Sequence, residues 1–135
     1  MYNNNPSWAE RFEPSPEITP EDVVKIQLEA LQNNDLTLDD GGIRTAFRFA
    51  SPDNRAATGP LGNFITLVKN PLYKAMIGFE EAKLTPMRFA GKIAQQHVTL
   101  LHRDGSQAVF VFTLSRQTEG AYAGCWMTDG VLRVG

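Results

Sequence analysis

Few side chains in this sequence have the chemistry for metal binding. His97 and His102 are five residues apart on one predicted strand, so they would point to opposite faces and would not share a metal ion. Cys125 is the only cysteine, which excludes an intramolecular disulfide and a site built from several cysteines. A lone cysteine is more often a small buried apolar residue than a ligand. The sequence therefore predicts no metal site and no cofactor.

Groups for acid–base chemistry are also scarce in the predicted strands. Asp129 is the only carboxylate within the last strand, and the pair Asp129-Gly130 also fits a turn or a bulge. Burial inside a cavity would raise the pKa of such a carboxylate toward neutrality. Tyr73 and Tyr122 offer hydroxyl groups to a ligand oxygen, although tyrosines at the ends of elements more often leave the hydroxyl in water. We predict no catalytic residue.

Arg44, Arg48 and Arg55 form the one local group of basic residues. Guanidinium groups bind carboxylates and phosphates through paired hydrogen bonds, so this group is a candidate partner-binding site. The alternative is pairing within the chain, with acidic residues of the first helix or of the loop Asp39-Asp40. We favour pairing within the chain.

Three helices are predicted in the first half of the chain. The first begins where Thr19 can cap backbone N–H groups and Pro20 suits the first helical position. Apolar residues then recur at three- and four-residue spacings, as in a helix that packs on a core. The Ser-Pro-Asp-Asn run at 51–54 is interpreted as a stop and a turn after the second helix. The expected ranges are 20–32, 43–50 and 61–69.

Four strands are predicted in the second half, and the short turns between them make them antiparallel. Asp104-Gly105 is the strongest hairpin signal. The first strand is the weakest, because Pro86 cannot donate to a ladder and fits only an edge or a bulge. Residues 108–114 are apolar on both faces, so one face meets the helices and the other meets the tail, a partner subunit or the inside of a curved sheet. The expected ranges are 79–89, 92–103, 106–116 and 122–134.

Length and composition indicate one globular domain. The chain has 135 residues, of which 42% are hydrophobic and 21% charged, and these values are typical of folded proteins. The net charge of -2 supplies no positive field for nucleic acid. We see neither a secretory signal nor an apolar segment long enough to span a membrane, and we expect a cytoplasmic protein. We divide the chain into a flexible tail over 1–18, whose Trp8 and Phe12 would fold back or dock elsewhere, and a single domain over 19–135.

Several stretches resemble a known but uncharacterised family. They lie at 20–31, 42–52 and 126–131, and the run Ile-Arg-Thr-Ala-Phe-Arg-Phe-Ala-Ser-Pro at 43–52 is the most distinctive. These stretches are similar to a domain-of-unknown-function family of the cystatin-like and nuclear-transport-factor-2-like superfamily, which occurs in cyanobacteria, other bacteria and plants. The resemblance implies an α+β fold in which three N-terminal helices pack on a curved four-stranded antiparallel sheet and form a cone. Members of the superfamily include isomerases, dehydratases, polyketide cyclases and binding modules, so the fold alone does not decide the chemistry.

Two functions follow from these observations. We prefer a non-enzymatic protein-binding or assembly module that uses the sheet face or the mouth of the cone, because no nucleophile–base pair, metal cluster or phosphate loop is recognisable. The last strands carry more large apolar side chains than one helical layer readily covers, which favours a homodimer or a protein partner, although core packing explains them equally well. The candidate partner-binding residues are Arg44, Arg48, Arg55, Phe110, Phe112, Trp126 and Met127.

The alternative is a small-molecule-binding protein, or an enzyme resembling the isomerases and dehydratases, with a pocket inside the cone. An apolar pocket with a few convergent polar groups would favour this alternative. Its candidate lining residues are Phe47, Phe64, Tyr73, His97 and Asp129.

Overall fold

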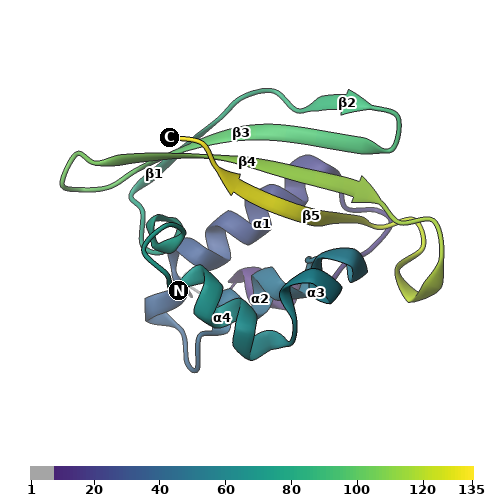
Figure 1. The fold of residues 1–135 in the computed structure, drawn as a ribbon, viewed down its shortest axis with the longest axis horizontal. Helices are drawn as coiled ribbons and strands as arrows, with labels where there is room; N and C mark the ends of the chain where they lie inside the picture. Colours follow the sequence, from purple (N-terminus) through teal and green to yellow (C-terminus); the bar gives the residue numbers. More distant parts are fainter. Residues whose placement is uncertain (1–7) are drawn as a thin grey trace, which may run out of the picture.

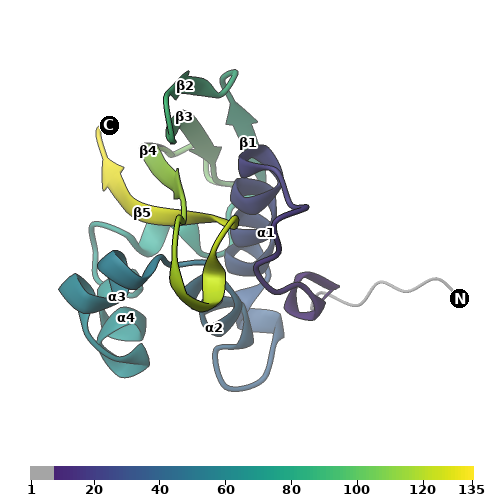
Figure 2. The ribbon, with the colours of Figure 1, turned by 90° about the vertical axis from the view of Figure 1, so that its right-hand side faces the viewer.

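The computed structural model describes residues 8–135, and within them four α-helices precede five β-strands. All the α-helices lie on one side of a twisted antiparallel sheet (Figures 1 and 2). The α+β class and the order of helices before strands are therefore as expected. The bounds are α1 (Pro20–Gln32), α2 (Gly41–Arg48), α3 (Pro52–Thr58), α4 (Leu61–Val68), β1 (Glu81–Leu84), β2 (Arg88–Ala90), β3 (Ile93–Leu101), β4 (Gln107–Arg116) and β5 (Trp126–Arg133), with short 3-10 helices η1 (Trp8–Arg11), η2 (Asn34–Leu36), η3 (Lys74–Met76) and η4 (Gly120–Tyr122).

The prediction of three helices was wrong because the run at 51–54 starts a helix as well as ending one. The Ser51 side chain accepts a hydrogen bond from the Asn54 N–H at 3.2 Å, and Pro52 occupies the first helical position of α3. A serine cap followed by proline is a helix-start signal. The chain thus turns out of α2 and enters α3 through only three residues, 49–51.

The prediction of four strands was wrong at the first strand, which is divided in two. β1 and β2 both pair antiparallel with β3, and Pro86 lies between them. Proline has no N–H to give to the ladder, so the pairing stops at that point and resumes two residues later. The resulting order is β1-β3-β4-β5, with β2 beside β3 on the same edge as β1.

The two turn signals in the sheet behave as the sequence indicates. β3 and β4 form a hairpin around Asp104-Gly105, where Gly105 has a φ of 90° that glycine adopts without strain. The register between β4 and β5 shifts, since Thr128 pairs with Leu114 and Gly130 pairs with Thr113. Asp129 is thus the extra residue of a bulge.

The core lies between the helices and one face of the sheet. The inward side chains of β4, which include Phe110, Phe112 and Leu114, are almost completely buried, and so is the inward stripe of α1, which includes Val23 and Val24. The alternate residues of β4 are only partly buried. One face of this central strand therefore meets the helices, as expected.

The start of α2 is held by a polar network around the buried Asn34 side chain. Asn34, which is 1% exposed, accepts a hydrogen bond from the Ile43 N–H at 2.8 Å and donates one to the Asp40 carboxylate at 3.1 Å. Lys69 pairs with the other Asp40 oxygen at 3.0 Å. The Asn34 hydrogen bond, followed by that of Lys69, lowers the pKa of Asp40 below its ordinary value. Asn34 thus supplies the cap for α2 that the Asp40 side chain does not make.

A glycine lets α1 and α2 approach closely at this corner. A Cβ atom at Gly42 would lie 2.0 Å from the carbonyl oxygen of Ala30 in α1. Because backbone cannot move aside as a flexible side chain can, the contact admits only glycine at this position.

The N-terminal segment packs on the helices where it is described. Ala9 in η1 is completely buried, and the rings of Trp8 and Phe12 meet edge to face at 5.6 Å. Arg48 donates hydrogen bonds to the carbonyl oxygens of Glu10 and Phe12. Of the tail expected over 1–18, η1 lies against α1 and α2, and residues 1–7 lie outside the described residues.

Candidate functional site

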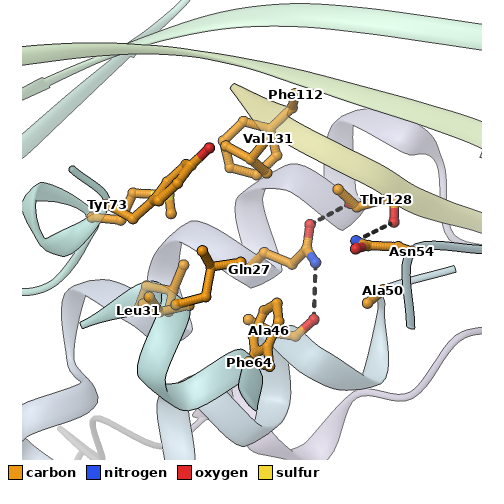
Figure 3. A pocket seen from close by; sticks show the side chains of 13 residues that line it. Gln27, Leu31, Ala46, Ala50, Asn54, Phe64, Tyr73, Phe112, Thr128 and Val131 are labelled. Atoms are coloured by element: carbon orange, nitrogen blue, oxygen red, sulfur yellow. Dashed lines mark hydrogen bonds between the residues drawn. The ribbon is translucent and has the colours of Figure 1, made fainter. Parts of the chain in front are cut away.

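A small cavity lies between the helices and the sheet (Figure 3). Its volume is about 70 Å³, and its walls come from α1, α2, α3, α4, η3, β4, β5 and the segments that follow α2 and α4. Most of the lining side chains are apolar.

The burial of the lining residues separates a floor from a rim. The floor is less than 5% exposed and consists of Gln27, Leu31, Ala46, Ala50, Val68, Met76, Phe112 and Thr128. The rim is partly or largely exposed and consists of Asn54, Phe64, Leu67, Tyr73 and Val131. The cavity is therefore closed at its base and reaches solvent between α3, α4, the start of η3 and β5.

Polar groups at the floor bind one another. The Gln27 side-chain amide donates a hydrogen bond to the Ala46 carbonyl oxygen at 3.0 Å, and its oxygen accepts one from the Thr128 hydroxyl at 2.6 Å. Asn54 donates to the Thr128 carbonyl oxygen at 3.1 Å. These bonds, drawn in Figure 3, join α1, α2, α3 and β5. A primary amide has two N–H groups and two lone pairs, so Gln27 keeps one donor and one acceptor position beyond these bonds.

Tyr73 brings a hydroxyl group to the rim. Its ring stacks on Phe110, with centroids 6.0 Å apart and planes at 28°. Figure 3 shows its hydroxyl oxygen directed into the cavity, toward Val131 and Phe112. Tyr73 is the only titratable side chain among the lining residues that the structure describes. The cavity thus presents one phenolic donor on a rim whose other side chains, apart from Asn54, are apolar.

The structure brings only part of the predicted pocket together. Phe64 and Tyr73 line the cavity, whereas Phe47 packs against Phe64 at 5.2 Å between ring centroids and lies outside the lining. His97 is exposed on the opposite face of the sheet, where it pairs with Val111. Asp129 is the partly exposed bulge residue and does not line the cavity.

Three polar lining residues were missed by the sequence reasoning. Gln27 lies within the apolar stripe of α1, and a polar residue at a buried helical position must find a partner inside the protein. The position of Gln27 within an apolar stripe could therefore have been used to predict a buried hydrogen bond. Asn54 and Thr128 carry no comparable signal, because their role depends on contacts between segments far apart in the sequence.

The three arginines each bind within the chain. Arg44 donates to the Asp39 carbonyl oxygen at 2.6 Å. Arg48 donates to the carbonyl oxygens of Glu10 and Phe12 in the N-terminal segment. Arg55 donates to the carbonyl oxygens of Phe47 and Arg48, each at 3.0 Å, and its guanidinium lies 4.7 Å from the centroid of the Phe47 ring. The partners are backbone carbonyls rather than the carboxylates that the sequence suggested. Arg55 thereby satisfies carbonyls at the end of α2.

The apolar partner candidates fall into two groups. Phe110, Phe112 and Met127 are at most 1% exposed, so they are core residues of the chain itself. Trp126 is partly exposed, and its ring meets that of Phe89 at 6.0 Å and 73°. Only Trp126 of this set is accessible to a partner. The expected homodimer stays a prediction.

The remaining candidates for metal or thiol chemistry lie apart from one another. Cys125 is buried, and burial raises the pKa of its thiol. His102 has its Nε2 atom 2.8 Å from the Ala75 carbonyl oxygen. Within residues 8–135, no three histidine, cysteine, aspartate or glutamate side chains gather in a way that suits a metal ion. Over the same residues, every helix is too short or too polar to cross a lipid bilayer.

Fold and site together define an α+β protein in which a helical layer covers one face of an antiparallel sheet and a small apolar cavity forms between the layers. The family described as Domain of unknown function (DUF4864) matches residues 15–133, and the chain belongs to this family. Membership of a domain-of-unknown-function family is what the stretches at 20–31, 42–52 and 126–131 led us to expect. No curated protein and no solved structure matches the chain.

Proposed function

We propose that the chain is a non-enzymatic binding module whose cavity mouth receives one apolar side chain of a partner protein. The observation that carries this proposal is the size of the cavity. At about 70 Å³ it is about half the volume of an engineered cavity of roughly 150 Å³ that binds benzene. Pockets that enclose whole small molecules span roughly 300–1,000 Å³. A branched aliphatic side chain therefore suits the space better than a complete substrate.

The chemistry of the lining supports binding rather than turnover. General acid–base catalysis needs a group that exchanges protons near the working pH and lies within hydrogen-bond reach of the substrate. Of the described lining residues only Tyr73 carries an ionisable group, and at the floor the Gln27 amide oxygen accepts a hydrogen bond from the Thr128 hydroxyl. An apolar anchor that enters from the rim would meet Phe64, Leu67 and Val131 first.

We further propose that the fold belongs to the cystatin-like and nuclear-transport-factor-2-like superfamily. Support comes from the helices that precede the sheet in the chain and from their position on one face of a twisted antiparallel sheet (Figure 2). In this assignment the cavity is the interior of the cone. A single cysteine that is buried is also in keeping with a reducing compartment such as the cytoplasm.

The test is selection of short random peptides on the protein, with a cavity-filling variant as counter-selection. Val131→Phe puts a larger side chain at the rim of the cavity, and Leu132→Phe makes the same kind of change one residue away, where the side chain is 62% exposed. We expect the selected peptides to share one Leu, Ile or Met anchor, to bind Leu132→Phe as they bind the wild type, and to bind Val131→Phe at least about tenfold more weakly. Equal binding to both variants would contradict the cavity as the docking site.

A second candidate function rests on the Tyr73 hydroxyl. A small ligand with an aliphatic body and one oxygen could place that oxygen against Tyr73 and the free positions of the Gln27 amide. Thermal-shift measurement with a series of short-chain alcohols, ketones and amides would detect it. A stabilisation that is lost in Tyr73→Phe, in the absence of any selected peptide, would replace the protein-binding proposal with this one.

A further inference from the structure

The sheet edge formed by β5 is partly covered by the chain itself. β5 is the last strand in the order β1-β3-β4-β5 and lies on the side of α3 and α4 (Figure 2). Thr128 makes a parallel bridge with Ala50, in the segment between α2 and α3. The Thr128 N–H donates to the Phe49 carbonyl oxygen at 2.7 Å, and the Ser51 N–H donates to the Thr128 carbonyl oxygen at 2.9 Å. A short extended segment of this chain thus pairs with the β5 edge.

Beyond this bridge the β5 edge has main-chain groups without a neighbour. The Val134 N–H donates to the carbonyl oxygen of Val109 in β4 at 2.8 Å. Bonded pairs alternate along an antiparallel ladder, so Leu132 turns its N–H and C=O toward β4, and Val131 and Arg133 turn theirs away from it. Within residues 8–135, no segment on that side makes a backbone hydrogen bond to Val131 or Arg133. This stretch is therefore a free strand edge.

The free stretch borders the mouth of the cavity. Val131 lies opposite Phe112 in the ladder and Arg133 lies opposite Phe110, and both phenylalanines are buried against the helices. Residues opposite each other share a face of the sheet, so Val131 and Arg133 point to the helix side. Val131 lines the cavity (Figure 3), and the Arg133 guanidinium carbon lies 5.8 Å from the Phe110 ring centroid. A residue added opposite Val131 would direct its side chain into the mouth.

We propose that an extended polypeptide segment pairs with the β5 edge at Val131 and Arg133 and places one aliphatic side chain in the cavity mouth. The inference rests on the proposed function, and it adds main-chain pairing as the way in which the partner is held. The alternating donors and acceptors of an extended backbone complement those of the edge, and residues 49–51 of the chain already pair with β5 in this manner. In such complexes the backbone supplies affinity and the pocket selects the side chain.

A second copy of the chain fits this edge less well. If the copy paired through its own β5, its Val131 and Arg133 would be the residues on the helix side. Val131 already lines the copy's own cavity, and Arg133 donates to the Leu72 carbonyl oxygen of the same chain at 3.0 Å. Neither side chain is free to enter a neighbouring cavity. A separate segment with an unengaged leucine, isoleucine or methionine meets the requirement.

The first experiment is an amide NMR titration with one capped heptapeptide that has leucine at its centre and threonine elsewhere. Threonine favours the extended backbone. We expect the amides of Val131 and Arg133 to shift, and to exchange with solvent at least about tenfold more slowly in the complex. Leu132 is the internal control, because its N–H is already directed to β4. Unshifted amides at Val131 and Arg133 would overturn the edge pairing, whereas the selection of random peptides decides the cavity by itself.

Single N-methylation of the heptapeptide tests the main-chain hydrogen bonds without changing the protein. In either strand direction, every second N–H of the peptide faces β5. Methylation at those positions should weaken binding at least about fivefold, and methylation at the positions between them should change it by less than about twofold. Losses that do not alternate along the peptide would overturn the edge pairing.

Two variants at one position separate the edge N–H from its side chain. Arg133→Pro and Arg133→Ala both remove the guanidinium, but only the proline removes the N–H that faces the added strand. Proline is tolerated on an edge strand where the N–H points away from the ladder. We expect Arg133→Pro to bind the heptapeptide at least about threefold more weakly than Arg133→Ala. Equal binding by the two variants would contradict the edge pairing.

Val131→Phe distinguishes the two proposals. If it weakens binding while the N-methylation losses do not alternate, docking at the cavity stands and the edge pairing fails. If the losses alternate and Val131→Phe has no effect, the edge pairing stands and docking at the cavity fails. A dimeric protein whose Val131 and Arg133 amides are protected without peptide would make a second copy the occupant and overturn the proposal.

Discussion

Two polar networks, each centred on a buried amide side chain, lie near the two ends of α2, and they differ in what adjoins them. At the start of the helix, Asn34 binds the Ile43 N–H and Asp40, and the Gly42 backbone lies directly against α1. Near its other end, Gln27 binds the Ala46 carbonyl oxygen and Thr128, but these groups adjoin a cavity of about 70 Å³. A polar network enclosed by packed chain holds the fold. A polar network beside an open space also has positions left for a ligand.

The largest expected effect is at the closed network, in Gly42→Ala. The new Cβ would lie 2.0 Å from the Ala30 carbonyl oxygen, so α1 and α2 must separate, and we expect a loss of about 3 kcal/mol or more in the free energy of unfolding. Urea denaturation measures this change in the free energy of unfolding. The matched control is Gly62→Ala in α4, where a Cβ meets nothing within 4 Å and stability should be unchanged or rise by less than about 1 kcal/mol. Equal stability of the two variants would mean that α1 and α2 are not in close contact.

Asn34→Ala should have the next largest effect. It leaves the buried Ile43 N–H without a partner and removes the hydrogen bond to Asp40, which we expect to cost about 2–3 kcal/mol. Peptides selected for the cavity should still bind the folded variant with wild-type affinity, because Asn34 does not line that space. If the Asn34→Ala variant is fully folded but no longer binds the peptides, the network at Asn34 and the network at Gln27 are coupled.

Gln27→Leu should change peptide binding at the cavity, whereas Asn34→Ala should change only the free energy of unfolding. The Thr128 hydroxyl and the Ala46 carbonyl oxygen each lose a partner, at an expected cost of about 1–2 kcal/mol. The added apolar branch also changes the floor of the cavity, so affinity for cavity-selected peptides should change by at least about threefold. Isothermal titration with a selected peptide, set beside the urea data, gives both readouts. Unchanged affinity would place the docking site elsewhere.

The smallest expected effect is the pH dependence contributed by Asp40. Its pKa is lowered in the folded protein by Asn34 and then by Lys69, so folding is favoured by the ionised form. The contribution is present above the unfolded pKa of about 3.9 and is lost as the pH falls through the lower folded pKa. We expect less than about 1 kcal/mol, because the pair is partly exposed.

Asp40→Asn isolates this contribution. Between about pH 6 and pH 3 the variant should lose less stability than the wild type. Identical pH profiles for Asp40→Asn and the wild type would mean that the carboxylate is not stabilised by folding.

Local signals in the chain were enough to predict most of the elements. Thr19 caps α1 with an accepted hydrogen bond from the Asp22 N–H, and Asp104-Gly105 turns the β3–β4 hairpin. The helix count and the strand count were each wrong at a place where one local signal acts on two neighbouring elements. The serine and proline at 51–52 both end one helix and begin the next, and Pro86 both marks an edge and divides the strand that contains it.

The sites were less predictable than the elements. Phe64 and Tyr73 were expected in the pocket, but Gln27 and Thr128 are 101 positions apart in the chain and meet only because β5 packs across α1. Phe89 and Trp126 likewise come together through the order of strands in the sheet. No local pattern specifies such pairs.

The sequence by itself determined the class of fold, the start of α1, the hairpin and the edge character of the segment around Pro86, because capping, turn geometry and the missing proline N–H act within a few residues. The tertiary structure decided which polar residues adjoin open space and which are enclosed, and which aromatic rings remain exposed. Those properties depend on how whole layers pack against one another, since burial is a property of the assembled core and not of any segment.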